Sequence, residues 1–197
     1  MKPRIGKINR KTKETSIELT ISLDGSGKVA AATGVGFLDH MLDHLGKHGG
    51  CDITIAAKGD LAVDDHHTTE DVGICLGQAL AAALGDKTGI RRFGSASVPM
   101  EEVLANVAVD LSGRPAVVFN ARFSGGKIGT FDTQLVEEFF RRLAATAGLN
   151  LHVNVPYGGN DHHVAEAIFK AFAQALRMAK EIDPSRRGEV PSTKGTL

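Results

Sequence analysis

The stretch Asp65-His66-His67-Thr68-Thr69-Glu70 has a second copy 96 residues later, Asp161-His162-His163-Val164-Ala165-Glu166. Each copy leads into an apolar, alanine-rich segment that we predict to be a helix, over residues 68–84 and 164–182. The segments before them also match, because a predicted helix (37–48 and 133–147) is followed by a predicted strand (51–57 and 149–155) in both places. The chain therefore contains one β/α unit twice.

This repeat predicts an α+β fold with pseudo-two-fold symmetry. Further strands are expected at 17–23, 103–111 and 116–123, and a glycine- and proline-marked link is expected around Gly94 to Pro99. Neither half is large enough to be comfortably stable alone. We therefore expect a single domain over 1–197, made of two fused repeats (about 1–92 and 93–183) and a polar tail, 184–197.

Composition narrows the possible partners. The 197 residues include 23 basic and 23 acidic residues, and this zero net charge argues against general binding to nucleic acid or a membrane surface. Two cysteines make no disulfide framework, and no apolar run approaches the roughly 18 residues of a membrane span. The first residues, Met1 to Ile5, lack the apolar stretch of a signal peptide, so we expect a cytoplasmic protein.

The duplicated His-His-x-x-Glu motif has the chemistry of a metal site. Residues i and i+4 share a helix face, whereas adjacent residues lie about 100° apart. Two motifs facing across a pseudo-two-fold axis would make two sites, each with one histidine from each motif and one glutamate. Position 40 falls on position 138 under the repeat, which adds a fourth ligand to each. The candidate ligands are His40, His66, His67, Glu70, Glu138, His162, His163 and Glu166.

Imidazole and carboxylate without thiolate suit manganese, iron or zinc. Asp65 and Asp161 are expected to cap the two helices and to hydrogen-bond the histidines. His44 and His48 continue the face of His40 and could line a pocket beside the metals. His152, alone in a predicted strand, is expected to be structural.

The ordered motifs of the chain resemble those of the imidazoleglycerol-phosphate dehydratase family. They include Lys13-Glu14-Thr15, Asp24-Gly25-Ser26-Gly27, Phe37-Leu38-Asp39-His40, the two His-His motifs, Asp110-Leu111-Ser112-Gly113-Arg114-Pro115, Phe131-Asp132-Thr133 and Pro191-Ser192-Thr193-Lys194-Gly195. The resemblance extends over essentially the whole chain. It implies helices packed between two four-stranded sheets, two manganese ions per subunit, and a 24-subunit homo-oligomer with shared active sites. The implied reaction converts imidazole glycerol phosphate into imidazole acetol phosphate in histidine biosynthesis.

The resemblance also implies roles for single residues. One metal would be held by His40, His67, His162 and Glu166. The other would be held by His66, Glu70 and His163, with Glu138 standing where the family has a histidine and His152 as the alternative fourth ligand. Glu14 and Glu166 match catalytic positions. The implied substrate contacts are Glu14, His40, His48, Arg92, Arg114, Lys170, Ser192, Thr193 and Lys194. Five of them match the family's phosphate contacts, namely Arg92, Arg114, Lys170, Ser192 and Lys194.

Two other functions fit the histidine clusters. A two-metal phosphoesterase would use paired ions for phosphate hydrolysis, although such enzymes usually carry more aspartate ligands. A metal-storage or metal-stapled shell protein would need the clusters but not Glu14 or the arginines.

Overall fold

The computed structural model describes residues 3–186 and 188–197, so residues 1, 2 and 187 of the expected domain and tail lie outside the described part. Each half of the chain builds one four-stranded sheet. The first has the order β1-β2-β4-β3 and comprises β1 (Ile5–Lys11), β2 (Thr15–Ser22), β4 (Asp52–Gly59) and β3 (Val29–Ala32). The second has the equivalent order β5-β6-β10-β7 and comprises β5 (Phe93–Met100), β6 (Val103–Asp110), β10 (Asn150–Tyr157) and β7 (Ala116–Asn120).

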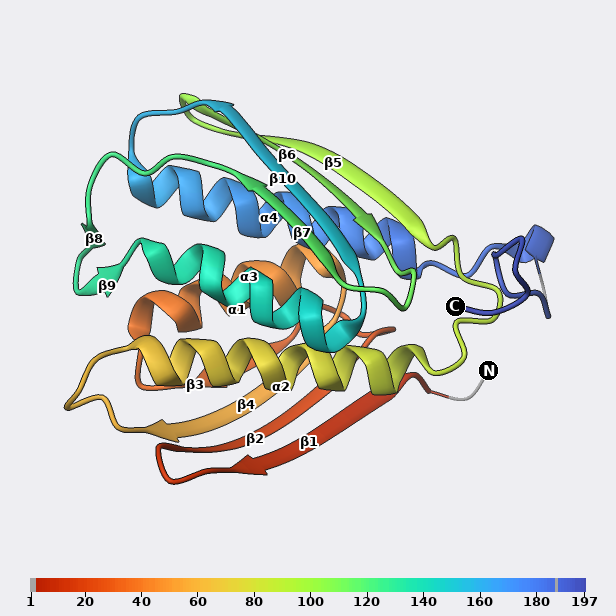
Figure 1. Ribbon diagram of the computed structural model, residues 1–197, viewed down its shortest axis with the longest axis horizontal. Coiled ribbons are helices and arrows are strands. Elements are labelled where there is room, and N and C mark those ends of the chain that lie inside the picture. Colours follow the sequence, from red (N-terminus) through yellow and green to blue (C-terminus); the bar gives the residue numbers. More distant parts are fainter. Residues whose placement is uncertain (1–2, 187) are drawn as a thin grey trace.

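Four helices fill the space between the sheets (Figure 1). They are α1 (Gly36–Gly49), α2 (His66–Leu84), α3 (Gln134–Ala147) and α4 (Asp161–Lys180). A small hairpin of β8 (Lys127–Ile128) and β9 (Phe131–Asp132) precedes α3, and a 3-10 turn (Pro184–Arg186) follows α4. The predicted duplicated α+β architecture is confirmed.

The sheets repeat each other in pairing as well as in order. Three strands of each sheet pair antiparallel, whereas β3 runs parallel to β4 and β7 runs parallel to β10. A parallel neighbour requires a crossover connection. Helix α1 supplies it in the first half and α3 in the second, which places the following helices, α2 and α4, in equivalent positions.

Strand β5 runs through the segment expected to be a link, and β1 and β3 were not predicted either. The reason in β1 and β5 is close contact between strand and helix backbones. A Cβ on Gly6 would lie 1.9 Å from the carbonyl oxygen of Ala79 in α2, and one on Gly94 would lie 2.0 Å from that of Ala175 in α4. These strands lack large apolar residues there because the helix leaves no space for them.

The two halves share one core. Four phenylalanines from α3 and α4 are fully buried, and the rings of Phe140 and Phe169 have centroids 4.7 Å apart. A Cβ on Gly77 of α2 would lie 2.5 Å from the carbonyl oxygen of Leu143 in α3, so these helices also pack closely. This packing fixes the helix ends, which carry the duplicated motif.

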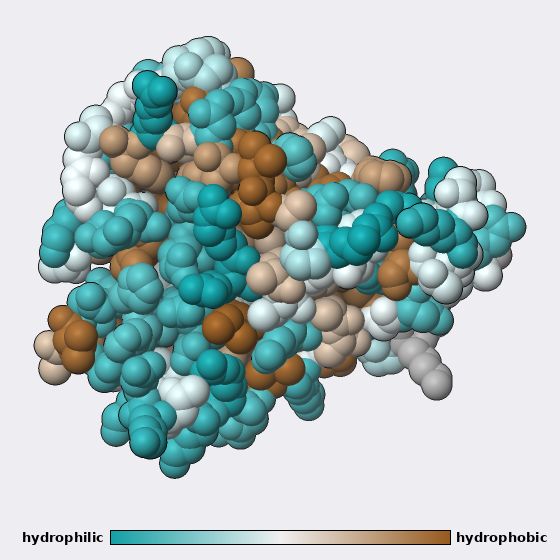
Figure 2. Space-filling model, in the orientation of Figure 1, coloured by the Kyte–Doolittle hydropathy of each residue, from teal (hydrophilic) through white to brown (hydrophobic). Residues whose placement is uncertain are grey.

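The face seen in Figure 2 is mostly hydrophilic, with smaller hydrophobic areas between the polar side chains. Among the described residues, no helix combines the length and the apolar character needed to cross a membrane.

Candidate active site

The duplicated motifs begin α2 and α4 at the same end of the molecule. The side chain of Asn160 accepts hydrogen bonds from the backbone N–H groups of His162 and His163, at 2.9 and 3.4 Å, and thereby caps α4. The expected cap by Asp161 is wrong, because its carboxylate accepts from the N–H groups of Ser124 and Gly125 instead.

Helix α2 also differs from the expectation. Asp65 makes no side-chain cap, and Asp64 accepts the hydrogen bond from the His66 N–H at 2.8 Å. The aspartate that directly precedes each His-His pair, Asp65 or Asp161, therefore neither caps the start of its helix nor hydrogen-bonds a histidine. In α4 it instead ties the loop that leads to β8 against the end of the helix.

The first cluster consists of His40 from α1 with His162 and Glu166 from α4. One donor atom of each lies within 4.8 Å of the others. Glu166 is only 7% exposed. Burial opposes its ionisation, but the hydrogen bond from the Lys170 ammonium and the nearby charges prevail and lower the pKa of the Glu166 carboxyl.

The second cluster consists of His66 and Glu70 from α2 with Glu138 from α3. Their donor atoms also lie within 4.8 Å of one another. The internal repeat relates the clusters ligand by ligand, so that Glu138 stands where the first cluster has His40. The Arg142 Nε atom lies 2.6 Å from Glu138 and 3.1 Å from Glu70. Both clusters offer nitrogen and oxygen donors without thiolate, and these donor sets fit a divalent ion such as manganese, iron or zinc.

The structure brings together three members of each predicted ligand set and leaves out the fourth. His67 and His163 each point away from both clusters toward a carboxylate. The Nδ1 atom of His67 lies 3.0 Å from Asp60, and that of His163 lies 3.0 Å from Glu102. A carboxylate at Nδ1 leaves Nε2 of each ring as the available ligand atom.

Asp60 and Glu102 were both missed in the sequence. Glu102 lies 88 residues after Glu14, in the turn of the β5–β6 hairpin that repeats the β1–β2 hairpin, so the duplication could have identified it. Hydrogen bonds from the Asn160 N–H and from His163 lower the pKa of Glu102 to about 2. The hydrogen bond to Asp60, together with the charge of Glu14, raises the pKa of His67.

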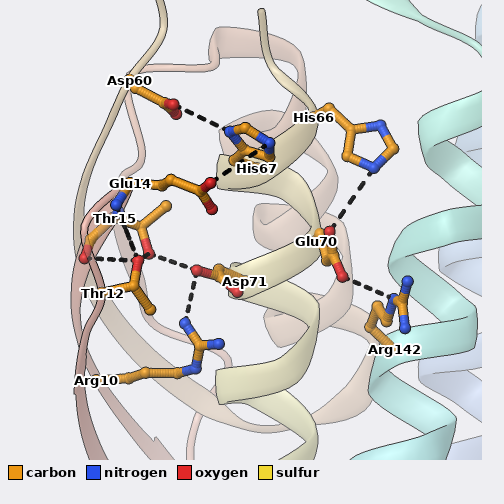
Figure 3. A network of polar contacts seen from close by, with 10 residues as sticks. All are labelled: Arg10, Thr12, Glu14, Thr15, Asp60, His66, His67, Glu70, Asp71 and Arg142. Carbon is orange, nitrogen blue, oxygen red and sulfur yellow. Dashed lines mark hydrogen bonds and ion pairs between the residues drawn. The ribbon is translucent and has the colours of Figure 1, made fainter.

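Glu14 lies in the β1–β2 turn, next to α2 (Figure 3). Its carboxylate is 4.0 Å from His67 Nε2. The Thr12 hydroxyl accepts from the N–H groups of Glu14 and Thr15, which fixes the turn. Asp71 ties this turn to α2 by accepting hydrogen bonds from Thr15 Oγ1 at 2.5 Å and from Arg10 at 2.6 Å. Glu14 is thus a solvent-accessible carboxylate that a fixed turn holds beside His67.

The predicted substrate contacts divide between the two ends of the helix layer. Lys170 contacts Glu166, and the rings of His44 and His48 stack at 5.7 Å along α1, beginning beside the first cluster. Burial lowers the pKa of His44 to about 4, so this ring is neutral near pH 7.

Of the implied phosphate contacts, Lys170 thus lies at the first cluster, whereas the others lie at the opposite end, near the chain termini. Arg92 pairs with Asp110 at 2.7 Å and donates to the Pro191 carbonyl, which ties the tail to this end. The segment before Arg114 lies at the same end, because the Leu111 N–H donates to the Arg92 carbonyl and Gly113 lies against Leu197. The tail that follows Pro191 carries the other candidates there, Ser192, Thr193 and Lys194. Helix α2 has 19 residues and is therefore about 28 Å long, so one chain does not bring the clusters and these residues together.

His152 does not complete the second cluster. It is exposed on β10, where it pairs opposite Ala108 of β6, and Glu138 is the residue that joins His66 and Glu70. Within one chain, His152 therefore lies apart from the cluster for which it was the alternative fourth ligand, and the structural role expected for it stays a prediction.

Comparison with known proteins gives one consistent result. The family model for imidazoleglycerol-phosphate dehydratase matches residues 33–176. A relative of that name from Rhodopseudomonas palustris is 59% identical over 194 residues, covering 98% of each chain, and one from Agrobacterium fabrum is 55% identical over the full length of both. The crystal structure of the Staphylococcus aureus enzyme is 46% identical with a TM-score of 0.83, covering 91% of this chain and 99% of that one. The Pyrococcus furiosus structure is 37% identical with a TM-score of 0.84, covering 96% and 100%.

Proposed function

The chain belongs to the imidazoleglycerol-phosphate dehydratase family, and on that premise we propose that it removes water from imidazole glycerol phosphate to give imidazole acetol phosphate, a step of histidine biosynthesis, with two manganese ions per subunit. The observation that carries the proposal is the pair of three-donor clusters related by the internal repeat. Beside them, the solvent-accessible carboxylate of Glu14 lies next to His67, a histidine that belongs to neither cluster.

The fourth ligand of each cluster comes from another copy of the chain in this proposal. His67 would complete the first cluster of a neighbour, and His163 would complete the second. The support is that Asp60 and Glu102 hold Nδ1 of these rings, which leaves Nε2 free to bind. Because an ion bound between copies also joins them, the proposed 24-subunit assembly depends on metal.

The separation within one chain supports a shared active site. A substrate made of one imidazole ring, three carbons and one phosphate is much shorter than the roughly 28 Å of α2 that separates the clusters from Arg92, Arg114 and the tail. Arg92, Arg114 and the tail of one copy would therefore hold the phosphate of a substrate whose ring lies at the clusters of other copies.

The proton to be removed lies on carbon 2 of the glycerol chain, where no neighbouring carbonyl makes it acidic. Manganese bound at the clusters would act as a Lewis acid that orients the imidazole ring and favours its imidazolate form. The imidazolate can supply the electrons that expel hydroxide from carbon 3, and the electron-poor ring that results can then accept the electron pair released when the carbon-2 proton is removed. Glu14 would transfer the carbon-2 proton as the general base. Glu166 would hold a metal and keep Lys170 next to the site, while His40 and His48 would contact the substrate.

The test measures two products in one reaction. Purified protein with imidazole glycerol phosphate and manganese should form the ketone product without releasing inorganic phosphate, and a chelator should stop the reaction. Release of phosphate would favour the two-metal phosphoesterase. Bound manganese without turnover of any kind would favour the storage or shell protein.

A further inference from the structure

The two clusters are alike in geometry and different in donors. Each combines one residue from α1 or α3 with a His and a Glu four residues apart on the helix of the other half, within the same 4.8 Å limit. The first cluster has two imidazoles and one carboxylate. The second has one imidazole and two carboxylates, because Glu138 occupies the position that corresponds to His40 in the internal repeat.

We propose that the two metal sites of this chain have different metal preferences, with the Glu138 cluster selecting the harder ion. The inference rests on the proposed function, because it takes both clusters to be metal sites. Imidazole suits zinc, whereas carboxylate oxygen suits manganese and magnesium. If a neighbour's histidine completes each cluster, it adds the same donor to both, so the difference between His40 and Glu138 persists in the assembled protein.

Neighbouring cations do not cancel this difference. In the first cluster, the ammonium of Lys170 contacts the single carboxylate, so the formal charges balance. In the second, one guanidinium, Arg142, serves two carboxylates, so one negative charge remains. The second cluster therefore attracts a divalent cation more strongly by charge alone.

Solvent access to the carboxylate ligands points in the same direction. The Glu166 side chain is 9% exposed, whereas those of Glu138 and Glu70 are 22% and 25% exposed. Carboxylates that are open to solvent suit ions that keep part of their water shell. The first cluster has one nearly buried carboxylate and two solvent-accessible imidazoles, and an imidazole-rich donor set suits zinc.

The experiment is a zinc titration of the manganese-loaded assembly, with manganese and zinc per chain determined by elemental analysis after removal of free ions. Zinc exceeds manganese in affinity at most nitrogen and oxygen sites, but by less where carboxylates dominate. We expect manganese to leave in two steps of one ion per chain, separated by about tenfold or more in zinc concentration. Activity is not needed for this measurement.

Two variants assign the steps. Glu138→His should move the later step onto the earlier one, and His40→Glu should move the earlier step onto the later one. Glu137→His is the matched control, because Glu137 neighbours Glu138 on α3 but pairs outward with Arg141 and should leave both steps in place. Loss of both ions in one step, unchanged by Glu138→His, would overturn the inference while leaving two metal sites. Failure of the protein to bind manganese at all would overturn the proposed metal dependence together with it.

Discussion

Replacement of Asp71 by asparagine tests how the structure holds Glu14 in position. Asp71 is 7% exposed and accepts hydrogen bonds from Arg10 and from Thr15, the residue that follows Glu14. Asparagine keeps the shape and one acceptor oxygen but removes the charge. A hydrogen bond to a charged group contributes about 1.5–3 kcal/mol. Because the Arg10 side chain is 30% exposed, its charge is partly screened, and we expect a loss of about 2 kcal/mol.

For a domain of this size, that loss lowers the melting temperature by about 4–8 °C at fixed protein and metal concentration. The looser β1–β2 turn should also lower kcat by about tenfold or more, since small displacements of a catalytic group are costly. Bound metal should stay unchanged, because Asp71 contacts neither cluster directly. Thermal unfolding, steady-state kinetics and elemental analysis give the three readouts.

Asp86→Asn is the control, because Asp86 is an exposed carboxylate just beyond the other end of α2. This variant should melt within about 1 °C of the parent protein and keep its kcat, as surface substitutions usually do. An Asp71→Asn protein that also kept its melting temperature and its kcat would refute the reasoning, because other contacts would then hold Glu14 in position.

Four further outcomes are expected. Glu14→Gln should lower kcat by roughly 10²-fold in steady-state assays while substrate binding and metal content persist; equal losses in binding and turnover would make Glu14 a binding residue. Chelation should shrink the assembly in light scattering, and an unchanged particle would count against metal between copies. Gly6→Ala and Gly94→Ala should both destabilise the protein by about 1–3 kcal/mol in chemical unfolding, because each Cβ would collide with a helix carbonyl; a neutral Gly94→Ala would contradict the close contact. Burial raises the pKa of the Cys75 thiol to about 11, so just above pH 9 this thiol ionises only in the unfolded protein. The free energy of unfolding should therefore fall as the pH rises from 9 to 11, and Cys75→Ala should make this fall with pH less steep.

The repeat in the sequence carried most of the information about the fold. Helices α1 to α4 and the strands β2, β4, β6, β7 and β10 follow from apolar periodicity. Strands β1 and β5 do not, because Gly6 and Gly94 face helix backbones and leave no apolar pattern to detect. Contacts between backbones depend on the tertiary packing, which no local pattern reports.

The candidate site divides in the same way. Helical i, i+4 spacing and the internal repeat identified three members of each cluster, including Glu138. Which way His67 and His163 turn could not be predicted, because it depends on Asp60 and Glu102. Asp60 lies in the loop before α2, where no helical spacing relates it to His67, and Glu102 lies 61 residues from His163. The residues that bind the first N–H groups of α2 and α4 were also predicted wrongly. Asp64 and Asn160, which neighbour the predicted Asp65 and Asp161, accept those hydrogen bonds instead.

The central claim is that each active site is assembled from more than one copy of the chain, and subunit mixing tests it most directly. His67→Ala removes the ligand donated to a neighbour, and His162→Ala removes a ligand of the receiving cluster, so each variant alone should be inactive. Mixed in equal amounts, dissociated with chelator and reassembled with manganese, they should regain activity, because about a quarter of the first sites would combine an intact receiving cluster with an intact His67. The account would be contradicted if the reassembled mixture had the normal particle size and the normal metal content at the second site but stayed inactive. Full activity of His67→Ala alone would also contradict it.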